Sequence, residues 1–481
     1  MSPLTREQIN TIAESVAAHL GNIAPQPVTP AHPAATPSQM GDGIFYQMDD
    51  AVSAARKAHL QLLSMTLKKR DEIIGSIRTS MREHSRDLAK RAHEETGLGR
   101  YEDKIEKNNL IIEKTPGTEA LQPITWTGDR GLTLVERAPF GVIGSITPTT
   151  NPTSTIIGNT IGMVAAGNAV VFNVHPSAKT VSVHNIQLLN KAITAVGGPP
   201  NLVTAISEPT IDSAQQLMTH PGIDLLVVTG GAGVVKAAMS SGKRALCAGP
   251  GNPPVVVDET ADFDHAAKSI VTGASMDNNI ICVTEKEVFV VDSVADKLLA
   301  AFKKQNAVVL SVEQIAQLEK IIFAKTYGPR KHAVMEKSLI GKNIQVILSK
   351  IGMHVDDNIR LAIAPVGPEH PLVWTEQMMP VLPVVRMPDV DSAIDLAKEA
   401  EHGFRHTAVM HSKNLDNLSR MARVMDCSIF VKNGPSLAGL GYGGEGYTSF
   451  TIASPTGDGL TGPRTFSRER RCILVDHFRI V

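Results

Sequence analysis

This chain of 481 residues is poor in cysteine and in aromatic side chains, and it carries almost no net charge. Its four cysteines are too scattered for a disulfide scaffold, which favours a reducing compartment such as the cytoplasm. Lys plus Arg number 47 and Asp plus Glu 48, so no charge excess indicates a nucleic-acid or anionic membrane partner. No apolar run approaches the ~18 residues needed to cross a bilayer, and the N-terminus lacks the apolar core of a signal peptide. The sixteen histidines show no metal-ligand spacing, so we expect no metal site.

The first forty residues differ in composition from the rest of the chain. Residues 1–20 predict a short amphipathic helix, because apolar side chains recur at spacings of three and four from Ile9 to Leu20. Residues 21–40 are rich in proline and predict an extended linker. A helix this short is marginal alone in water, so its apolar face needs a partner. One alternative is that the helix docks on the chain's own body or on a sister subunit. The other is that the tethered helix recruits the protein to a larger assembly.

The next segments predict helices followed by an alternation of strands and helices. Helices are expected over 51–63, 68–83 and 85–97. The β-branched runs 142–147, 169–174, 202–206 and 225–229 predict strands, and the segments 155–166, 180–195, 210–219 and 233–241 predict helices between them. This order is typical of a parallel sheet covered on both faces.

Small, polar turns follow three of these strands. They are Thr147-Pro148-Thr149, the segment from Asn173 to His175-Pro176, and the turn that begins Thr229-Gly230-Gly231. Ligands of parallel sheets bind beyond the carboxyl ends of the strands. The glycine turn opens a helix, whose free N–H groups suit a pyrophosphate. The same turn is also compatible with a tight strand-to-helix connection that binds no ligand.

A second α/β segment extends from residue 254 to about 440. Its expected strands are 255–257, 287–291, 381–386, 407–411 and 428–431, with a helix over 294–305. The end of the chain, residues 470–481, predicts a basic-then-apolar strand with its apolar residues at 472–475, which we expect to pair with another edge, often that of a neighbouring subunit.

Cys282 lies in this second segment with no other cysteine nearby. A lone cysteine is either a small, inert core residue or a candidate nucleophile. A nucleophile requires a thiol pKa below its ordinary value of about 8.5. Since no basic residue adjoins Cys282 in sequence, we expect local N–H groups and a bound cationic cofactor to lower this pKa.

Four motifs resemble one protein family over nearly everything from residue 41 to the end. They are Ile146-Thr-Pro-Thr-Thr-Asn-Pro152, Ala166-Gly-Asn-Ala-Val-Val171, Gly403-Phe-Arg-His-Thr-Ala408 and Thr465-Phe-Ser-Arg-Glu-Arg-Arg-Cys472. The chain resembles the aldehyde dehydrogenase superfamily, and within it the CoA-acylating acetaldehyde and propionaldehyde dehydrogenases of bacterial microcompartments. The N-terminal peptide resembles an encapsulation peptide.

This resemblance implies an α/β fold with a Rossmann-type parallel-sheet cofactor domain, an α/β catalytic domain and a small oligomerisation strand element. The implied domains are an encapsulation-like helix (1–20), a linker (21–40), an NAD/CoA-binding domain (41–253, with 121–139 contributing to oligomerisation), a catalytic thiol domain (254–440) and a C-terminal return with an oligomerisation strand (441–481).

The resemblance also assigns residues to roles. Cys282 is similar to the catalytic thiol. The implied cofactor-binding residues are Thr147, Pro148, Thr149, Asn173, His175, Pro176, Thr229, Gly230, Gly231, Val234, Gly249 and Glu376. The implied substrate pocket contains Thr150, Asn151, Ile281 and His406. Thr150 stands where the family has an oxyanion-binding asparagine and Asn151 follows it, so either side chain is a candidate for that role.

The implied activity is oxidation of a short-chain aldehyde, acetaldehyde or propionaldehyde, with NAD⁺ and coenzyme A, through a thioester on Cys282. Hydrolytic members carry a glutamate that activates water, and Cys247 occupies its position here. Cys247 is then either a space-filling spectator or a thiol that pairs with Cys282 under oxidation. A hydrolytic or phosphate-reducing dehydrogenase and a non-catalytic scaffold are the alternatives. The implied setting is a cytoplasmic microcompartment, where a homodimer or homotetramer binds shell or core proteins through residues 1–20.

Overall fold

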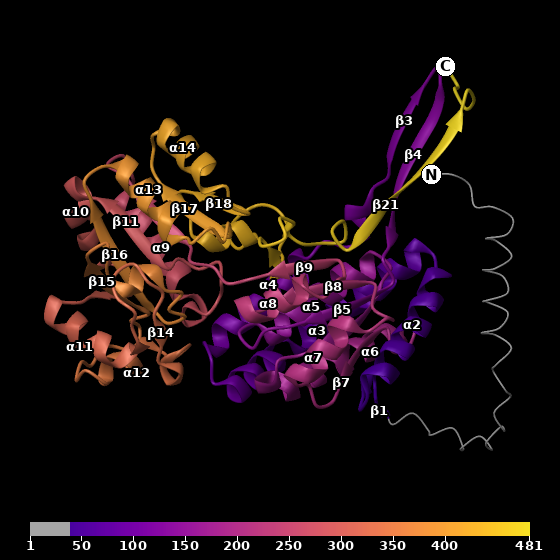
Figure 1. The fold of residues 1–481 in the computed structure, drawn as a ribbon, viewed down its shortest axis with the longest axis horizontal. Coiled ribbons are helices and arrows are strands. Elements are labelled where there is room, and N and C mark those ends of the chain that lie inside the picture. The colour runs from indigo at the N-terminus through magenta and orange to yellow at the C-terminus, as the bar shows by residue number, and fades with distance from the viewer. Residues whose placement is uncertain (1–38) are drawn as a thin grey trace, which may run out of the picture. The chain divides into compact units, whose positions relative to one another are not determined.

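The computed structural model describes residues 39–481 (Figure 1). The predicted helix over 1–20 and nearly all of the predicted linker lie outside these residues. Strand β1 (Gln39–Gly41) begins the described chain, so the last two residues predicted as linker belong to a sheet. Within 39–481, no helix combines the length and the apolarity needed to cross a membrane.

A seven-stranded sheet occupies the first half of the described chain, in the order β1-β2-β7-β6-β5-β8-β9. All its pairs are parallel except that of β1 with β2. Its further strands are β2 (Ile44–Phe45), β5 (Val142–Ile146), β6 (Ala169–Asn173), β7 (Val203–Ile206), β8 (Leu225–Thr229) and β9 (Ala245–Ala248). Every residue of β5, β6, β7 and β8 is buried, as the continuous apolar runs predict for a sheet covered on both faces.

The helices of this half are α2 (Met48–Leu63), α3 (Leu67–Thr96), α4 (Tyr101–Lys114), α5 (Pro152–Ala165), α6 (Lys179–Ala195), α7 (Ile211–Thr219) and α8 (Ala232–Met239), with short 3₁₀ turns at Thr118–Leu121 and Pro176–Ala178. The prediction of two helices over 68–97 is wrong, because α3 continues through Ser85. That serine is buried and donates a hydrogen bond to Asn109 Oδ1 at 2.8 Å, so it serves helix packing and ends no helix.

A second seven-stranded sheet, wholly parallel, lies within residues 254–440, in the order β12-β15-β16-β11-β10-β17-β18. Its strands are β10 (Pro254–Val257), β11 (Glu287–Val291), β12 (Ala307–Val309), β15 (Leu361–Val366), β16 (Val381–Met387), β17 (Thr407–His411) and β18 (Ile429–Lys432). Its helices are α9 (Phe263–Ser275), α10 (Asp292–Phe302), α11 (Val312–Ile322), α12 (Ile344–Ser349), α13 (Val390–Ala400) and α14 (Leu415–Met425). Small hairpins join β13 (Phe323–Lys325) to β14 (Val334–Met335) and β19 (Ile452–Ala453) to β20 (Gly459–Leu460). These two sheets confirm the predicted aldehyde-dehydrogenase-like α/β fold.

A separate three-stranded sheet has the order β21-β4-β3 (Figure 1). It consists of β3 (Ile124–Gly128), β4 (Gly131–Pro139) and β21 (Ser467–Val475). The terminal strand therefore pairs antiparallel with β4 of its own chain, over the whole register from Ser467 opposite Pro139 to Val475 opposite Gly131. The expectation that its partner edge often belongs to a neighbouring subunit does not describe this pairing. The strands of residues 124–139 and the terminal strand nevertheless form one sheet.

Candidate active site

All the residues predicted to bind a nucleotide except Glu376 lie at or just beyond one edge of the first sheet. Strands β6, β5, β8 and β9 are consecutive neighbours and run parallel. Their carboxyl ends therefore lie side by side, and each ends in one of the predicted segments. The segment 147–149 follows β5, Asn173 ends β6, Thr229 ends β8 and Gly249 follows β9. This is the edge at which parallel α/β sheets bind their ligands.

The polar groups at this edge suit a nucleotide. The hydroxyls of Thr147 and Thr149 have no hydrogen-bond partner among the described residues. Gly231 is the N-cap of α8 and supplies no side-chain cap, so the helix N-terminus keeps free N–H groups. A Cβ on Gly231 would meet no atom within 4 Å, which leaves open space in front of these groups. The edge thus offers donors and room for a pyrophosphate.

Two further predicted residues shape this edge. A Cβ on Gly230 would lie 2.6 Å from Val234 Cγ1, so the turn and the first turn of α8 pack too closely for any other residue. The Asn173 side chain is buried, and its Oδ1 accepts a hydrogen bond from Ser213 Oγ at 2.6 Å. Asn173 therefore ties β6 to α7, while His175 and Pro176 remain exposed just beyond it.

Cys282 follows a turn with an unusual backbone. Three consecutive residues before it, Asp277, Asn278 and Asn279, have φ angles of 49°, 54° and 66°. Asp and Asn tolerate single left-handed positions better than other non-glycine residues, but three in succession are unusual and require support from the surroundings. Here Asn278 Nδ2 donates to the Gly341 carbonyl at 2.9 Å. Asn279 Nδ2 donates to the carbonyls of Ala274 and Glu285 at 2.7 and 2.9 Å. These hydrogen bonds fix the path of the chain into Cys282.

Gly251 and His406 border the Cys282 position. A Cβ on Gly251 would lie 2.6 Å from the Cys282 carbonyl oxygen and 3.1 Å from His406 Cγ. The His406 ring is buried, its Nδ1 lies 2.8 Å from Thr407 Oγ1, and its Nε2 has no partner among the described residues. Burial lowers the pKa of His406 to about 4, so the imidazole is neutral. Ile281 is buried beside Cys282 in sequence and supplies an apolar neighbour.

Burial, together with the Glu376 carboxylate, keeps the Cys282 sulfur protonated. Burial and then the Glu376 carboxylate raise the pKa of Cys282 to about 12, whereas Lys286 acts to lower it. The lowered pKa expected of the nucleophile is therefore not found in the protein without ligands. The Glu376 carboxyl itself has a pKa raised by burial, against the effect of Lys286. Glu376 thus lies close enough to influence the thiol.

Lys286 is a site residue whose importance the sequence did not reveal. Its side chain is fully buried, and its ammonium donates to Asn279 O (2.8 Å), Asn279 Oδ1 (2.6 Å), Ile281 O (3.1 Å) and Thr284 Oγ1 (3.0 Å). Burial lowers the pKa of Lys286 to about 8. The ammonium thereby joins residues before and after Cys282 and supplies a cation that acts to lower the pKa of the thiol. In the sequence, Lys286 was marked only by its position four residues after Cys282. A lysine at that spacing is equally compatible with a solvent-exposed side chain.

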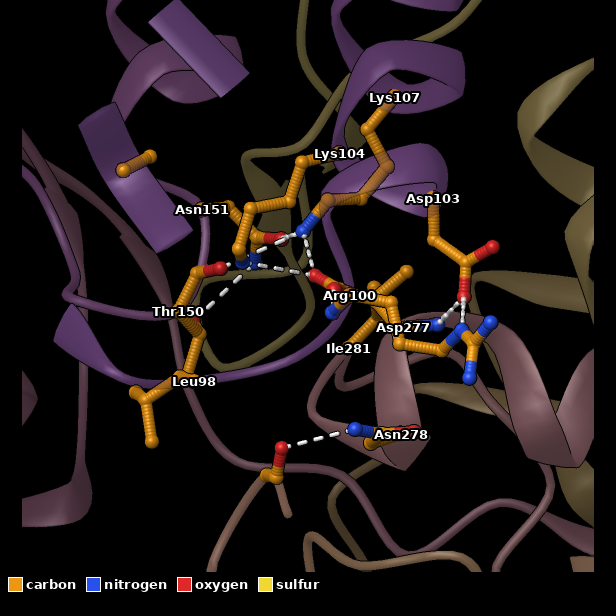
Figure 2. A network of polar contacts seen from close by, with 12 residues as sticks. Leu98, Arg100, Asp103, Lys104, Lys107, Thr150, Asn151, Asp277, Asn278 and Ile281 are labelled. Carbon is orange, nitrogen blue, oxygen red and sulfur yellow. Dashed lines mark hydrogen bonds and ion pairs between the residues drawn. The ribbon is translucent and has the colours of Figure 1, made fainter. Parts of the chain in front are cut away.

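A second group of buried charges joins α4 to the Cys282 turn (Figure 2). Lys104 donates to Asp277 Oδ2 at 3.1 Å, and Lys107 forms an ion pair with the same oxygen. Lys107 also donates to Asn151 Oδ1 at 2.7 Å and to the Thr150 carbonyl at 3.3 Å. Both predicted pocket residues after β5 therefore contact a lysine from α4, a helix whose polar residues the sequence analysis did not single out.

Comparisons with known proteins identify the family. The aldehyde dehydrogenase family matches residues 34–453. The chain belongs to the aldehyde dehydrogenase family. This aldehyde dehydrogenase is 51% identical over 452 residues to the acetaldehyde dehydrogenase (acetylating) EutE of Salmonella typhimurium, covering 94% of this chain and 96% of that protein.

Two solved structures are also similar to this aldehyde dehydrogenase. One is the Rhodopseudomonas palustris propionaldehyde dehydrogenase with bound CoA and an acylated cysteine, with a TM-score of 0.88, 48% identity, and coverage of 91% of this chain and 99% of that one. The other is a propionaldehyde dehydrogenase from the Clostridium phytofermentans fucose utilisation bacterial microcompartment, with a TM-score of 0.88, 46% identity, and coverage of 91% and 100%. The resemblance seen in the sequence motifs is confirmed.

The remaining cysteines lie in different surroundings. Cys247 is fully buried on β9 within the hydrophobic core, and burial raises its pKa to about 11. Cys427 is half-buried and its Sγ donates to the Ile429 carbonyl, while Cys472 is exposed on β21. All four cysteines are free. Across residues 39–481, no group of three or more histidine, cysteine or carboxylate side chains is arranged to hold a metal ion.

Proposed function

We propose that this aldehyde dehydrogenase is CoA-acylating: it oxidises a short-chain aldehyde, acetaldehyde or propionaldehyde, and transfers the acyl group to coenzyme A through a thioester on Cys282. The observation that carries the proposal concerns two cysteines. Cys282 is half-buried, and the position where hydrolytic members hold a glutamate is occupied by Cys247, whose thiol is buried. The names of the similar proteins, acetylating and propionaldehyde dehydrogenases, support the same activity.

Cys282 is the proposed nucleophile. Its thiol is neutral at rest, so it must lose its proton before it attacks the aldehyde carbonyl. The Lys286 ammonium favours the thiolate, because it is the strongest of the charges that lower the pKa of this thiol. The neutral His406 ring keeps an unpartnered Nε2 near the site, which can accept a hydrogen bond from a thiol or a water molecule.

The thioester is proposed to persist until CoA arrives. Hydrolysis needs a base that activates water, and Cys247 cannot act as one, since burial raises the pKa of its thiol to about 11. The hydrophobic neighbours of Cys247 in the first sheet also exclude water from this position. A thiolate of CoA is a far stronger nucleophile than water and takes the acyl group. Cys247 acts here as a packing residue.

The proposed nucleotide partner is NAD⁺, with CoA as the second substrate. The carboxyl edge of the first sheet would hold it: the segment 147–149, Asn173 with His175 and Pro176, the turn Thr229–Gly231 with Val234, and Gly249, while Glu376 would bind the nicotinamide ribose. When bound, the nicotinamide supplies the hydride acceptor that converts the adduct on Cys282 into a thioester. The unpartnered threonine hydroxyls and the uncapped α8 N-terminus support this assignment.

We further propose a homo-oligomer inside a cytoplasmic microcompartment. The support for oligomers is an exposed apolar row on the three-stranded sheet, formed by Ile124, Trp126, Ile473 and Val475, which are 39–60% exposed. The support for the compartment is the amphipathic pattern of residues 1–20 and the microcompartment origin of one similar structure. Removing residues 1–20 should leave kcat and KM unchanged and abolish co-purification with shell or core proteins. A large loss of kcat would contradict the proposal that residues 1–20 serve only to recruit the enzyme to the compartment.

An aldehyde panel with and without CoA tests the activity. We expect acyl-CoA and NADH in equal amounts, little free acid, and slow turnover without CoA. Equal rates of free-acid formation without any thiol acceptor would identify a hydrolytic enzyme, and acyl phosphate as product would identify a phosphate-reducing one. Absence of NADH formation with every aldehyde would favour a non-catalytic scaffold. Replacing NAD⁺ by NADP⁺ in the same panel establishes the nucleotide preference.

A further inference from the structure

The inference concerns Lys107, a lysine of α4 that lies far from Cys282 in sequence. Its side chain is only 4% exposed, and its ammonium contacts Asp277 in the turn before Cys282 and Asn151 after β5 (Figure 2). Two buried ammonium groups, those of Lys104 and Lys107, share the single Asp277 carboxylate. A buried charge is costly unless its hydrogen-bonding capacity is used. Here that capacity is used, because the two ammonium groups contact Asp277, Asn151 and the Thr150 carbonyl and so join α4 to the turn before Cys282 and to the segment after β5.

The contact with Lys107 determines how the Asn151 amide is oriented. An ammonium group can only donate, so the atom that faces Lys107 Nζ at 2.7 Å must be the amide oxygen of Asn151. The NH₂ group of Asn151 consequently points away from Lys107. One of its two hydrogens is used in a hydrogen bond to Thr150 Oγ1 at 3.1 Å. The second hydrogen has no acceptor among the described residues and remains available to a ligand.

The Asn151 side chain does not cap helix α5, although the residue stands at the N-cap position. It is the N-cap residue of α5, where an asparagine ordinarily accepts a hydrogen bond from the helix backbone. Its side chain makes no such bond, and its oxygen is committed to Lys107. The cost of leaving the helix uncapped is typically about 1 kcal/mol. The lysine contact thus replaces a local stabilising bond by one that joins three separate parts of the site.

We propose that Lys107 is a positioning residue of the acylation step: by holding Asn151 Oδ1, it presents the Asn151 NH₂ group to the oxyanion that forms when Cys282 attacks the aldehyde. This assignment rests on the proposed function. When the Cys282 thiolate bonds to the carbonyl carbon, the carbonyl π pair moves onto oxygen, and the negative charge that left sulfur rests there. The Asn151 N–H stabilises this charge, and the Lys107 ammonium behind the amide strengthens the donor. In support, Lys107 is among the cations that lower the pKa of the Cys282 thiol.

A double-mutant cycle on the full-length enzyme tests the assignment. NADH formation is measured for Lys107→Met, Asn151→Ala and the double variant with aldehyde and CoA. Loss of one oxyanion donor typically lowers kcat about 100-fold or more. We expect this loss in Asn151→Ala, a smaller loss of about 30-fold in Lys107→Met, and kcat and kcat/KM falling together because the interaction exists only in the transition state. The double variant should be no more than about threefold slower than Asn151→Ala, since Lys107 acts through Asn151. Losses that multiply would overturn the proposal.

Two further variants separate positioning from folding. Lys104→Met removes the neighbouring ammonium, which contacts Asp277 and forms no hydrogen bond with Asn151, and should cost less than about fivefold in kcat. Asn151→Asp keeps an acceptor for Lys107 but has no N–H group, so it should retain the wild-type Tm and be as slow as Asn151→Ala. A fast Asn151→Asp enzyme would overturn the proposal, even if Lys107→Met proved insoluble. If the wild type forms NADH and free acid, the CoA-acylating assignment fails while the cycle on NADH formation still reports on Lys107.

Discussion

Gly251 and the backbone of Cys282 lie so close together that a methyl group on Gly251 would displace a neighbour. A Cβ on Gly251 would lie 2.6 Å from the Cys282 carbonyl oxygen, well inside the contact distance of any real Cβ. Gly251 belongs to the connection between β9 of the first sheet and β10 of the second, and Cys282 to the turn before β11. Because β10 and β11 are parallel neighbours, the amino ends of these strands bring the connection and the Cys282 turn together.

Gly251→Ala should therefore displace the Cys282 turn. The new methyl group meets backbone on one side and the buried His406 ring on the other, so neither neighbour can yield by rotating a flexible side chain. We expect a loss of about 1–3 kcal/mol in the free energy of unfolding, as for other overpacked sites, and a loss of at least tenfold in kcat. Gly75→Ala in α3 is the control: its Cβ meets nothing within 4 Å, so it should stabilise the helix by about 0.5–1 kcal/mol and leave kcat unchanged. Equal kinetics of the two variants would show that Gly251 does not constrain the site.

Cys282→Ala should abolish NADH formation with every aldehyde, because no other described thiol can replace it. Cys247 is fully buried, and burial raises the pKa values of both Cys247 and Cys427. Mass spectrometry of the wild type with aldehyde and NAD⁺ but no CoA should detect an acyl adduct on the peptide that contains Cys282. Cys472→Ala, a change at an exposed thiol of β21, is the matched control and should keep wild-type turnover. Residual NADH formation by Cys282→Ala at the wild-type rate would place the nucleophile elsewhere.

Glu376→Gln should change two measurements in opposite directions. The Glu376 carboxylate raises the pKa of the Cys282 thiol, so its removal lowers this pKa and increases the thiolate fraction near pH 8. We expect alkylation of Cys282 by iodoacetamide in the absence of nucleotide to become severalfold faster. NADH formation should become slower, because the proposed ribose ligand is lost.

The wild-type alkylation rate should continue to rise to pH 10 without a plateau, since the pKa of Cys282 is about 12 in the protein without ligands. Added NAD⁺ should shift this profile to lower pH. Glu259→Gln, which changes an exposed carboxylate, controls for net charge and should leave both measurements unchanged. A wild-type plateau below pH 8 would contradict the raised pKa.

Ile473→Asp should dissociate the proposed oligomer. Trp126 and Ile473 both lie opposite Thr133 across β4, on one face of the three-stranded sheet, and are 53% and 58% exposed. A charge in this apolar row costs several kcal/mol if the row is buried between subunits. Analytical ultracentrifugation should then show a smaller species than the wild type forms. Leu415→Asp introduces the same charge at a leucine that is 76% exposed on α14 and should not change the sedimentation. Identical sedimentation of all three proteins would exclude this face as an interface.

The strands were the elements that the sequence predicted most closely. The segment 225–229 matches β8, and 407–411 matches β17. Each is a short run of apolar residues with polar or glycine-containing flanks, and burial on both faces of a parallel sheet demands that pattern. The helix over 68–97 was divided in error, because a serine can end a helix or pack against a neighbouring one, and only the Asn109 contact of Ser85 distinguishes the two.

The sequence by itself determined the family, through its motifs. It also determined the parallel first sheet, the α/β class of the second segment and the polar edge where we propose that the nucleotide binds, because these depend on hydrophobic periodicity and on turns that directly follow strands. Only the tertiary structure decided which charges act on Cys282. Lys286, Lys107, Asp277 and Gly251 are ordinary residues in the sequence. Lys107, Asp277 and Gly251 acquire their roles from distant parts of the chain, and Lys286 acquires its role from burial. Burial converts these side chains from solvated surface groups into fixed charges and contacts. No short sequence pattern reveals that change, because water is excluded from these side chains only when the whole chain has folded.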